Sequence, residues 1–380
     1  MDSKMLKIIM NKAGNGDCIS IESRTEFVLI DGGTAQSFSC WKSNVVGRDK
    51  IDCVIVTHID NDHVNGIIKL LQSNSCPNID QFYFNGAEQL FGNVNYNVES
   101  DRITDTKLRA ISEESSVIGS RDQIGYSEGT SLSYLLLDKR ITSNPSVGGA
   151  ALYRESCDTF YVGDMKFSVI GPSKLVLQEL KDRWEDKLSE RRIRPKVISK
   201  AFYEAFEHYA KALQETASNV IYVASTEERS IESLANIEFE DDHSMTNKSS
   251  LSFLIESNSK RLLYLSDCDA GTVISWLDSL GLEQIEVDAV KISHHGSKNN
   301  TSLELLNRIV CQKYLISTNG NSHDHPDLEV LARIAIVKKH SGAEIIMNYK
   351  VDHIPVWFTS ELQTSYPNIK LTMDSCEFDL

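Results

Sequence analysis

The chain has 380 residues, of which 41% are hydrophobic, and its formal net charge is −15 at pH 7. This length accommodates one α/β domain with insertions or two average domains. The acidic charge argues against a surface built mainly to neutralise a phosphate backbone, and no apolar run approaches the length of a membrane span.

The eight cysteines are scattered, and none forms a Cys-x-x-Cys pair. This spacing favours reduced thiols over a disulfide framework or a thiolate zinc site. The first five residues lack the apolar core of a signal peptide. We therefore expect a soluble, cytoplasmic protein without a membrane partner.

The first third of the chain alternates short apolar strands with glycine-rich turns. Residues 5–10, 18–22, 27–30 and 51–56 are predicted strands. The pair Gly14-x-Gly16 is not a nucleotide-binding fingerprint, because a strand follows it where a dinucleotide fold needs a helix. The glycines instead permit tight turns at one end of a sheet.

Four side chains that can bind metal lie between the predicted strand 51–56 and a predicted helix. They are His58, Asp60, Asp62 and His63. Imidazole with carboxylate is a ligand set of zinc, manganese or iron, and it lacks the thiolates of a purely structural zinc site. A solvated polar turn is the alternative, but four potential ligands within six positions argue against it.

Two long segments interrupt the strand pattern. Residues 85–150 are polar, with one predicted helix near residues 105–113, so we expect a loop-rich insertion that forms a substrate lid or a surface decoration. Residues 173–245 are expected to form a helical insertion. It contains one helix through Leu177–Leu188, a second at about residues 199–217, and an acidic loop from residue 230.

Ligand-type residues follow three further predicted strands in the C-terminal half. Asp267 follows strand 261–266, His294 and His295 follow strand 287–292, and His325 lies in a polar loop after strand 313–317. Groups at the carboxyl ends of strands can meet at one edge of a sheet. After a helix at 328–337, the remaining segment is predicted as strands.

The motif His58-x-Asp60-x-Asp62-His63 resembles the metallo-β-lactamase superfamily signature His-x-His-x-Asp-His, with Asp60 in place of the second histidine. This variant is similar to the hydrolase domain of competence-type (ComEC-type) DNA-uptake proteins. Further blocks match in order, namely Asp31-Gly32-Gly33, Leu265-Ser266-Asp267, His294-His295-Gly296-Ser297 and His325-Pro326.

The resemblance implies a single domain over residues 1–380. Its fold would be an αββα sandwich of two mixed β-sheets flanked by helices, with two divalent metal ions at one edge. By residue, the first ion would be held by His58 and Asp60, the second by Asp62, His63 and His294, and Asp267 would bridge them. His294 is preferred over His295 because it is nearer the strand end, which leaves His295 to contact substrate, but the sequence leaves that choice open.

Other residues receive supporting roles from the resemblance. Asp31 is expected to support the ligand loop by hydrogen bonds, and Ser297 to lie beside the ligands or substrate. Asn247, with His243 as the alternative, stands where the wider family has a further histidine. Because Asp60 hardens the first site, we expect Zn²⁺ or Mn²⁺, with Mg²⁺ or iron as alternatives. A one-metal enzyme is the other option.

The implied chemistry is hydrolysis by a metal-bound hydroxide. Asp62 is expected to be essential, and His295 or His325 would neutralise charge that develops on the substrate. The leading prediction is a phosphodiesterase or nuclease with a nucleic-acid substrate, which is what the resemblance to the competence-type pattern implies. The acidic net charge does not exclude it, because a metal pair would reverse the local sign of charge. The alternatives are a hydrolase of a small phosphoester, thioester or lactone, or a non-catalytic subunit of a defence complex. The chain could also pair with another protein or form a homodimer.

Overall fold

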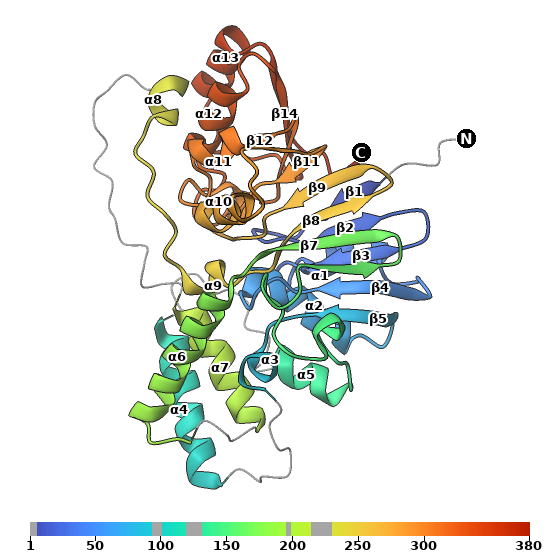
Figure 1. Ribbon diagram of the computed structural model, residues 1–380, viewed down its shortest axis with the longest axis vertical. Coiled ribbons are helices and arrows are strands. Elements are labelled where there is room, and N and C mark those ends of the chain that lie inside the picture. The colour runs from blue at the N-terminus through green and yellow to red at the C-terminus, as the bar shows by residue number, and fades with distance from the viewer. Residues whose placement is uncertain (1–5, 93–100, 119–130, 195–198, 214–229) are drawn as a thin grey trace.

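The computed structural model describes residues 6–92, 101–118, 131–194, 199–213 and 230–380. These residues form two mixed sheets that lie face to face, with helices against both outer faces (Figure 1). The predicted αββα sandwich is therefore confirmed. Among the described residues, no helix combines the length and apolar character needed to cross a bilayer.

The first sheet is mixed, with parallel pairing only between β3, β4 and β5. Its spatial order is β16 (Glu377–Asp379), β1 (Lys7–Met10), β2 (Ile19–Glu22), β3 (Phe27–Ile30), β4 (Lys50–Ile55) and β5 (Asn78–Tyr83).

The second sheet is antiparallel on one side and parallel on the other. Its spatial order is β15 (Ile369–Thr372), β14 (Ala343–Met347), β13 (Lys313–Ile316), β11 (Ala289–Lys291), β9 (Lys260–Tyr264), β8 (Ser252–Ser257), β7 (Met165–Gly171) and β6 (Thr159–Val162). A small parallel pair is formed by β10 (Ile285–Glu286) and β12 (Ile309–Val310).

The helices divide between the two outer faces and an end bundle. Those on the side of the first sheet are α1 (Phe38–Trp41), α2 (Asn61–Gln72), α3 (Ala87–Phe91), α4 (Arg102–Ile118), α5 (Leu132–Asp138), α6 (Lys174–Glu190), α7 (Lys200–Ala212) and α9 (Met245–Lys248). Those on the side of the second sheet are α8 (Ile231–Ala235), α10 (Ala270–Ser279), α11 (Leu303–Arg308), α12 (Leu328–Val337) and α13 (Val356–Ser365).

The second half of strand β4 shows why the central strands are apolar where both faces are covered. Cys53 and Ile55 pack in the layer between the sheets, whereas Val54 and Val56 pack against the helices. Successive side chains of a strand point to opposite faces, so a strand covered on both faces needs apolar residues at every position. The strand therefore forms a rigid base for the loop that follows it.

The insertions differ from the expected picture in their amount of helix. Residues 85–150, expected to consist mainly of loops, contain α3, α4 and α5 within their described part. Helices α4, α6 and α7 form a bundle at one end of the molecule (Figure 1). The predicted helix 199–217 is seen as α7, and its positions 214–217 lie outside the described residues. The segment from residue 230 contains α8, which packs on α12, and the C-terminal region contains α13 where only strands were predicted.

Helix α2 lies in direct backbone contact with the turn that follows β3. A Cβ atom on Gly66 would lie 1.8 Å from the Gly32 carbonyl oxygen, and the Gly66 amide donates to the Gly33 carbonyl oxygen at 3.0 Å. We expect Gly66→Ala to lower the free energy of unfolding by about 3 kcal/mol, because backbone must move to admit a methyl group. Urea denaturation measures this change.

Gly271 in α10 is the matched control for this substitution. Its added Cβ would approach only a side-chain oxygen, that of Asp269 at 3.1 Å. Gly271→Ala should change the free energy of unfolding by at most about 1 kcal/mol, in the stabilising direction. Equal losses in the two variants would contradict the close approach of α2.

Candidate metal centre

The loop after β4 presents the first four predicted ligands from a short stretch of backbone. Asp60 is the residue before α2, and its carbonyl oxygen accepts hydrogen bonds from the amides of His63 and Val64 at 3.0 and 2.9 Å. His58 lies in the loop, and Asp62 lies in the first helical turn. The amide of Gly32 donates to the His63 carbonyl oxygen at 2.8 Å, which fixes the turn against the first sheet.

Asp267, which follows β9, lies at the centre of three imidazoles. Its Oδ2 atom is 3.7 Å from Nε2 of His58, 3.3 Å from Nε2 of His63 and 3.6 Å from Nε2 of His295. Asp60 Oδ2 lies 3.3 Å from His58 Nε2, and Asp62 Oδ2 lies 3.4 Å from His295 Nε2. The carboxyl ends of β4, β9 and β11 therefore meet at one place, as predicted from the strand ends.

The donor atoms fit divalent metal ions. The Nε2 atoms of His58, His63 and His295, both carboxylate oxygens of Asp60, and Oδ1 of Asp267 are buried and make no hydrogen bond to any described residue. Two ligands of one tetrahedral ion are roughly 3.4 Å apart when each is about 2.1 Å from the metal. The observed separations match that spacing. Among the described residues, three groups of ligand atoms lie close enough to share an ion, namely His58, His63, Asp267; Asp62, His63, His295; and Asp17, Asp31, His63.

Hydrogen bonds behind the histidines present the metal-binding nitrogen of each ring. Asp31 Oδ2 lies 2.9 Å from His63 Nδ1 and accepts from the Thr57 hydroxyl at 2.8 Å. Thr57 Oγ1 is also 3.0 Å from His58 Nδ1. Since the Thr57 proton is given to Asp31, His58 Nδ1–H must donate to Thr57. One carboxylate thus sets the tautomer of both imidazoles, leaving each Nε2 free for a metal.

Asp31 makes hydrogen bonds to the ligand loop, as the resemblance implied, and its removal tests whether it supports metal binding. We expect Asp31→Asn to weaken Zn²⁺ or Mn²⁺ binding by about 10–100-fold, because the histidine tautomers are no longer fixed. Metal titration of chelator-treated protein measures this. Tyr264→Phe is the control, since the Tyr264 hydroxyl reaches Asp31 only at 3.4 Å. An Asp31→Asn protein that binds metal as tightly as this control would contradict the assignment.

The structure places the side chains of the two adjacent histidines differently from the expectation. His295 Nδ1 lies 2.9 Å from the Ser317 carbonyl oxygen, which can only accept, so Nδ1 carries the proton and Nε2 faces Asp62 and Asp267. His294, the preferred ligand from sequence, instead packs its Nδ1 against Asn300 and Asp242, at 3.1 and 3.5 Å. Both residues have positive φ, 45° and 55°, and this sharp turn separates their side chains.

The remaining predicted residues lie around His294 rather than among the converging ligand atoms. Asn247 Nδ2 donates to Asp242 at 2.7 Å and lies 3.3 Å from His294 Nδ1. The His325 ring is 5.3 Å from the His294 ring, centroid to centroid. Burial lowers the pKa of His325 to about 4, although Asp327 opposes this. Ser297 Oγ accepts from the Asn299 amide at 3.3 Å and so shapes the loop.

Charges within the cluster shift the protonation of its members strongly. Burial alone would raise the pKa of Asp267, but His63 and His295 hold it well below its usual range. Burial alone would lower the pKa of His295, but Asp267 and Asp17 raise it to about 10. The pKa of His63 is raised well above its usual value by Asp267 and Asp31, again against the effect of burial. Without metal, the Asp267 carboxylate is ionised and the His63 and His295 imidazoles hold protons.

Several residues of the site were not found from sequence. Asp17 and Lys291 form a buried ion pair beside Asp267, and Asp242 and Asn300 surround His294. A lysine between the apolar residues Val290 and Ile292 of the predicted strand 287–292 was a signal for the first pair, because a buried ammonium needs a counter-charge. Nothing in the sequence pattern indicated that Asp242, in an acidic segment, would be buried.

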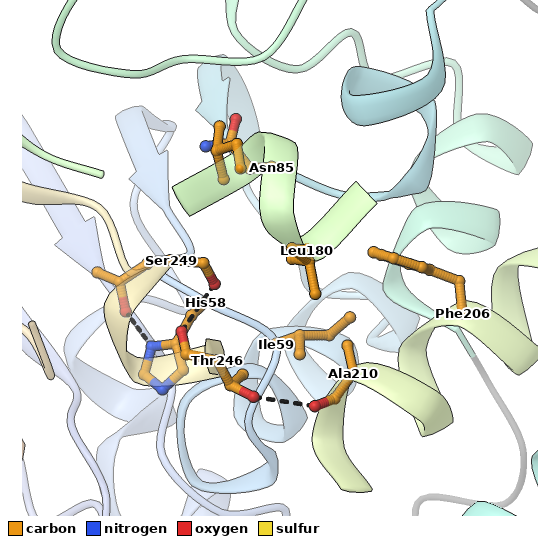
Figure 2. Close-up of a pocket in the computed structure, with 10 residues that line it drawn as sticks. His58, Ile59, Asn85, Leu180, Phe206, Ala210, Thr246 and Ser249 are labelled. Atoms are coloured by element: carbon orange, nitrogen blue, oxygen red, sulfur yellow. Dashed lines mark hydrogen bonds between the residues drawn. The ribbon is translucent and has the colours of Figure 1, made fainter. Parts of the chain in front are cut away.

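A small pocket adjoins the ligand loop beneath the helical insertion (Figure 2). Its apolar wall is made by side chains from the loop, α6 and α7, namely Ile59, Leu177, Leu180, Phe206 and Ala210. The opposite wall carries polar residues, including Thr57, His58, Thr246 and Ser249. The Thr246 hydroxyl donates to the Ala210 carbonyl oxygen at 2.9 Å, which joins α9 to α7 at this place (Figure 2).

Comparison with known families finds a match to the model of the Metallo-beta-lactamase superfamily over residues 11–79. This segment contains Asp31 and the loop with His58, Asp60, Asp62 and His63. Together with the αββα arrangement, the match supports the superfamily and a metal-dependent hydrolase. The closer resemblance to competence-type proteins is carried by the motifs alone.

Among solved structures, the chain is similar to the metallo-beta-lactamase fold protein YhfI from Bacillus subtilis, at 11% identity and a TM-score of 0.40, covering 99% of this chain and 100% of that one. The chain is also similar to a diphosphatase from the PhnP family, at 8% identity and a TM-score of 0.38, and the likeness covers 99% of this chain and 97% of that one. It is also similar to the E377D mutant of the CmlA beta-hydroxylase, at 9% identity and a TM-score of 0.38, and the likeness covers 100% of this chain and 54% of that one. No curated protein sequence matches this chain.

Proposed function

We propose that this protein is a metal-dependent phosphodiesterase that binds two divalent ions, with nucleic acid as a candidate substrate. The observation that carries the proposal is the convergence of three imidazole Nε2 atoms on Asp267 Oδ2, at 3.3–3.7 Å. His58 and Asp60 would hold one ion, Asp62, His63 and His295 the other, and Asp267 would bridge them. Ions bound here would lower the pKa of a water molecule and stabilise negative charge on the substrate.

The charge of the site supports two ions. Among the described residues, five carboxylates surround it, those of Asp17, Asp31, Asp60, Asp62 and Asp267, the buried ammonium of Lys291 faces them, and the ammonium of Lys211 also acts on Asp60. With neutral imidazoles, four negative charges remain when Lys291 is counted and three when Lys211 is counted as well, and one divalent cation would balance only two of them. Since an uncompensated buried charge is strongly unfavourable, a single ion would leave the site under-neutralised.

The residues around His294 supply the substrate-facing side of the site. Asp242 accepts hydrogen bonds from Asn247 and Asn300 at 2.7 and 2.9 Å, and this network holds the His294 ring by its Nδ1 atom. His294 is partly exposed, unlike His295, and His325 lies beside it. In the proposed reaction this pair of imidazoles contacts the substrate oxygens, the role that the sequence analysis expected for His295 and His325.

A screen of substrates tests the proposal. Protein loaded with Mn²⁺ or Zn²⁺ should cleave DNA or a bis-aryl phosphodiester, and Asp62→Ala should lower the rate by at least about 100-fold, since one electrostatic contact at a reacting centre accounts for that much. Ser297→Ala, which alters only a loop hydrogen bond, should retain metal. Absence of phosphodiester cleavage by protein shown to contain two ions would contradict the proposed activity.

The pocket under the insertion favours a second candidate. Leu177, Leu180 and Phe206 form an apolar wall of a small recess beside His58, and in this candidate function an apolar substituent of a small phosphoester, thioester or lactone would pack against that wall. The net charge of −15 also suits a small substrate better than a long polyanion. Cleavage of such esters without cleavage of DNA would select this candidate. Leu180→Trp, which places a larger side chain at this wall, should then raise KM for them.

A further inference from the structure

A buried lysine lies within reach of the central carboxylate of the metal centre. Lys291 ends β11, and its side chain is 1% exposed. The Lys291 Nζ atom is 3.9 Å from Asp267 Oδ1 and donates to the Ser266 carbonyl oxygen at 3.3 Å. The proposed reaction uses no ammonium at this place, so the lysine has a role still to be assigned.

The closest counter-charge of Lys291 is Asp17, whose carboxylate makes a direct ion pair with Nζ. Asp17 is completely buried, and among the described residues neither of its oxygens accepts a hydrogen bond of standard geometry. Its position is set by the backbone, because a Cβ on neighbouring Gly16 would lie 1.7 Å from the Asp62 carbonyl oxygen and the Asp17 carbonyl oxygen accepts from the Gly33 amide at 2.7 Å. The turn is therefore pressed against the ligand loop.

These distances place the ammonium between two carboxylates of different function. Asp267 must offer its oxygens to metal, and a lysine ammonium is a cation that could neutralise the same carboxylate. In a buried environment such an ion pair is strong, and it would occupy a ligand atom. The ion pair with Asp17 holds Nζ on the far side, 3.9 Å from Asp267 Oδ1 and away from Oδ2, where the three imidazoles meet.

We propose, on the premise of the metal-dependent function above, that Asp17 is a positioning residue that keeps Lys291 at 3.9 Å from Asp267 and prevents a direct hydrogen bond between them. Lys291 lowers the net negative charge of the buried site, and Asp17 prevents it from competing with the ions. This role concerns metal affinity and not contact with substrate.

The test compares three proteins by the number of Zn²⁺ or Mn²⁺ ions per chain and by their dissociation constants, together with circular dichroism of the chelated proteins. Asp17→Asn should bind metal about 100-fold more weakly, the upper range for a residue behind a ligand, while the chelated variant stays folded because Lys291 then pairs with Asp267. In the double variant Asp17→Asn/Lys291→Met the competing cation is gone. Its metal affinity should return to within about fivefold of the parent.

The outcomes separate this role from a purely structural one. If the double variant binds metal as weakly as Asp17→Asn, the Asp17–Lys291 ion pair is needed for the structure of the site itself, and the proposal is wrong. If Asp17→Asn binds metal within about threefold of the parent, the proposal is also wrong. Should Asp17→Asn fail to fold, the double variant, which buries no unpaired charge, decides alone: parent-like metal affinity supports the proposal and loss of metal overturns it.

Two controls complete the design. Asp52→Asn removes a buried carboxylate that pairs with Lys50 at 2.6 Å outside the site, and Lys338→Met removes a buried ammonium that donates to the Ile309 carbonyl oxygen at 2.7 Å. Both should lower stability and leave metal content unchanged. A parent protein that binds neither Zn²⁺ nor Mn²⁺ would overturn the proposed function itself, whereas a metal-binding parent with an unaffected Asp17→Asn variant overturns only this inference.

Discussion

Replacing Asp267 with asparagine is expected to abolish hydrolysis and to lower the metal content below one ion per chain. Asparagine has nearly the same shape, so the fold is retained, but the amide lacks the negative charge on which His58, His63 and His295 converge. The rate should fall by about 1,000-fold, which is the upper end of the effect of removing one electrostatic contact at a reacting centre. Mass spectrometry of bound metal and a phosphodiesterase assay measure the two effects.

Asp269 provides a matched control two residues along the chain. Its Oδ1 atom accepts a hydrogen bond from the Thr272 amide at 2.7 Å and so caps α10. Asparagine caps a helix about as well as aspartate, so Asp269→Asn should keep metal, activity and most stability. An Asp267→Asn protein with two ions and a rate within about tenfold of the parent would remove the basis for the proposed centre.

The strand ends explain why much of the site could be predicted from the sequence. His58, His63 and Asp267 each follow an apolar strand, and the carboxyl ends of these strands meet at one edge of the sandwich. A loop anchored on a buried strand has little freedom, so the residue order along the chain nearly determines which side chains meet. The structure brings together these residues as expected.

The choice between His294 and His295 could not be read from the sequence. Both follow β11 directly, and proximity to the strand end favoured the first. The direction of each side chain depends on a turn in which both residues have positive φ, and on partners far away in the chain, Ser317 for one and Asp242 for the other. Such long-range contacts leave no periodic pattern in the sequence.

The helix content of the insertion could not be predicted from the sequence for a similar reason. Residues 102–118 are rich in polar and charged side chains, so the sequence favoured loops with one short helix. The structure has a helix of 17 residues there, α4, whose Leu108 and Ile111 are buried in the core shared with α6 and α7. Most helix stability in proteins comes from packing of an apolar face, and the partner helices of α4 lie far along the chain.

Removal of metal with a chelator should eliminate activity and lower the melting temperature, and the size of this stabilisation should depend on pH. The pKa of His295 is raised to about 10 and that of His63 well above its usual value, so both rings are protonated in the metal-free protein at pH 7. A metal ion binds only the neutral ring and must displace these protons. Apparent affinity should rise by about tenfold per pH unit for each displaced proton.

The folding stability of the metal-free protein should change with pH in the opposite direction to its metal affinity. A group whose folded-state pKa lies above its unfolded value of about 6.5 stabilises the fold fully below that pH, and this contribution is lost as the pH rises through the folded-state pKa. For His295 the loss extends to about pH 10. The chelated protein should therefore lose stability from about pH 7 to pH 10, whereas the metal-loaded protein should not, because the ions replace the protons as partners of Asp267.

Thermal denaturation with and without chelator across this pH range measures the difference, and calorimetry in buffers of unlike ionisation enthalpy counts the protons released on metal binding. His295→Gln should release fewer protons than the parent, since one of the two imidazoles is gone. Equal metal affinity at about pH 7 and pH 9, with no proton release, would mean that Asp267 does not share its charge with these histidines. The expected metal content, pH dependence and loss of hydrolysis therefore all depend on one buried carboxylate, that of Asp267.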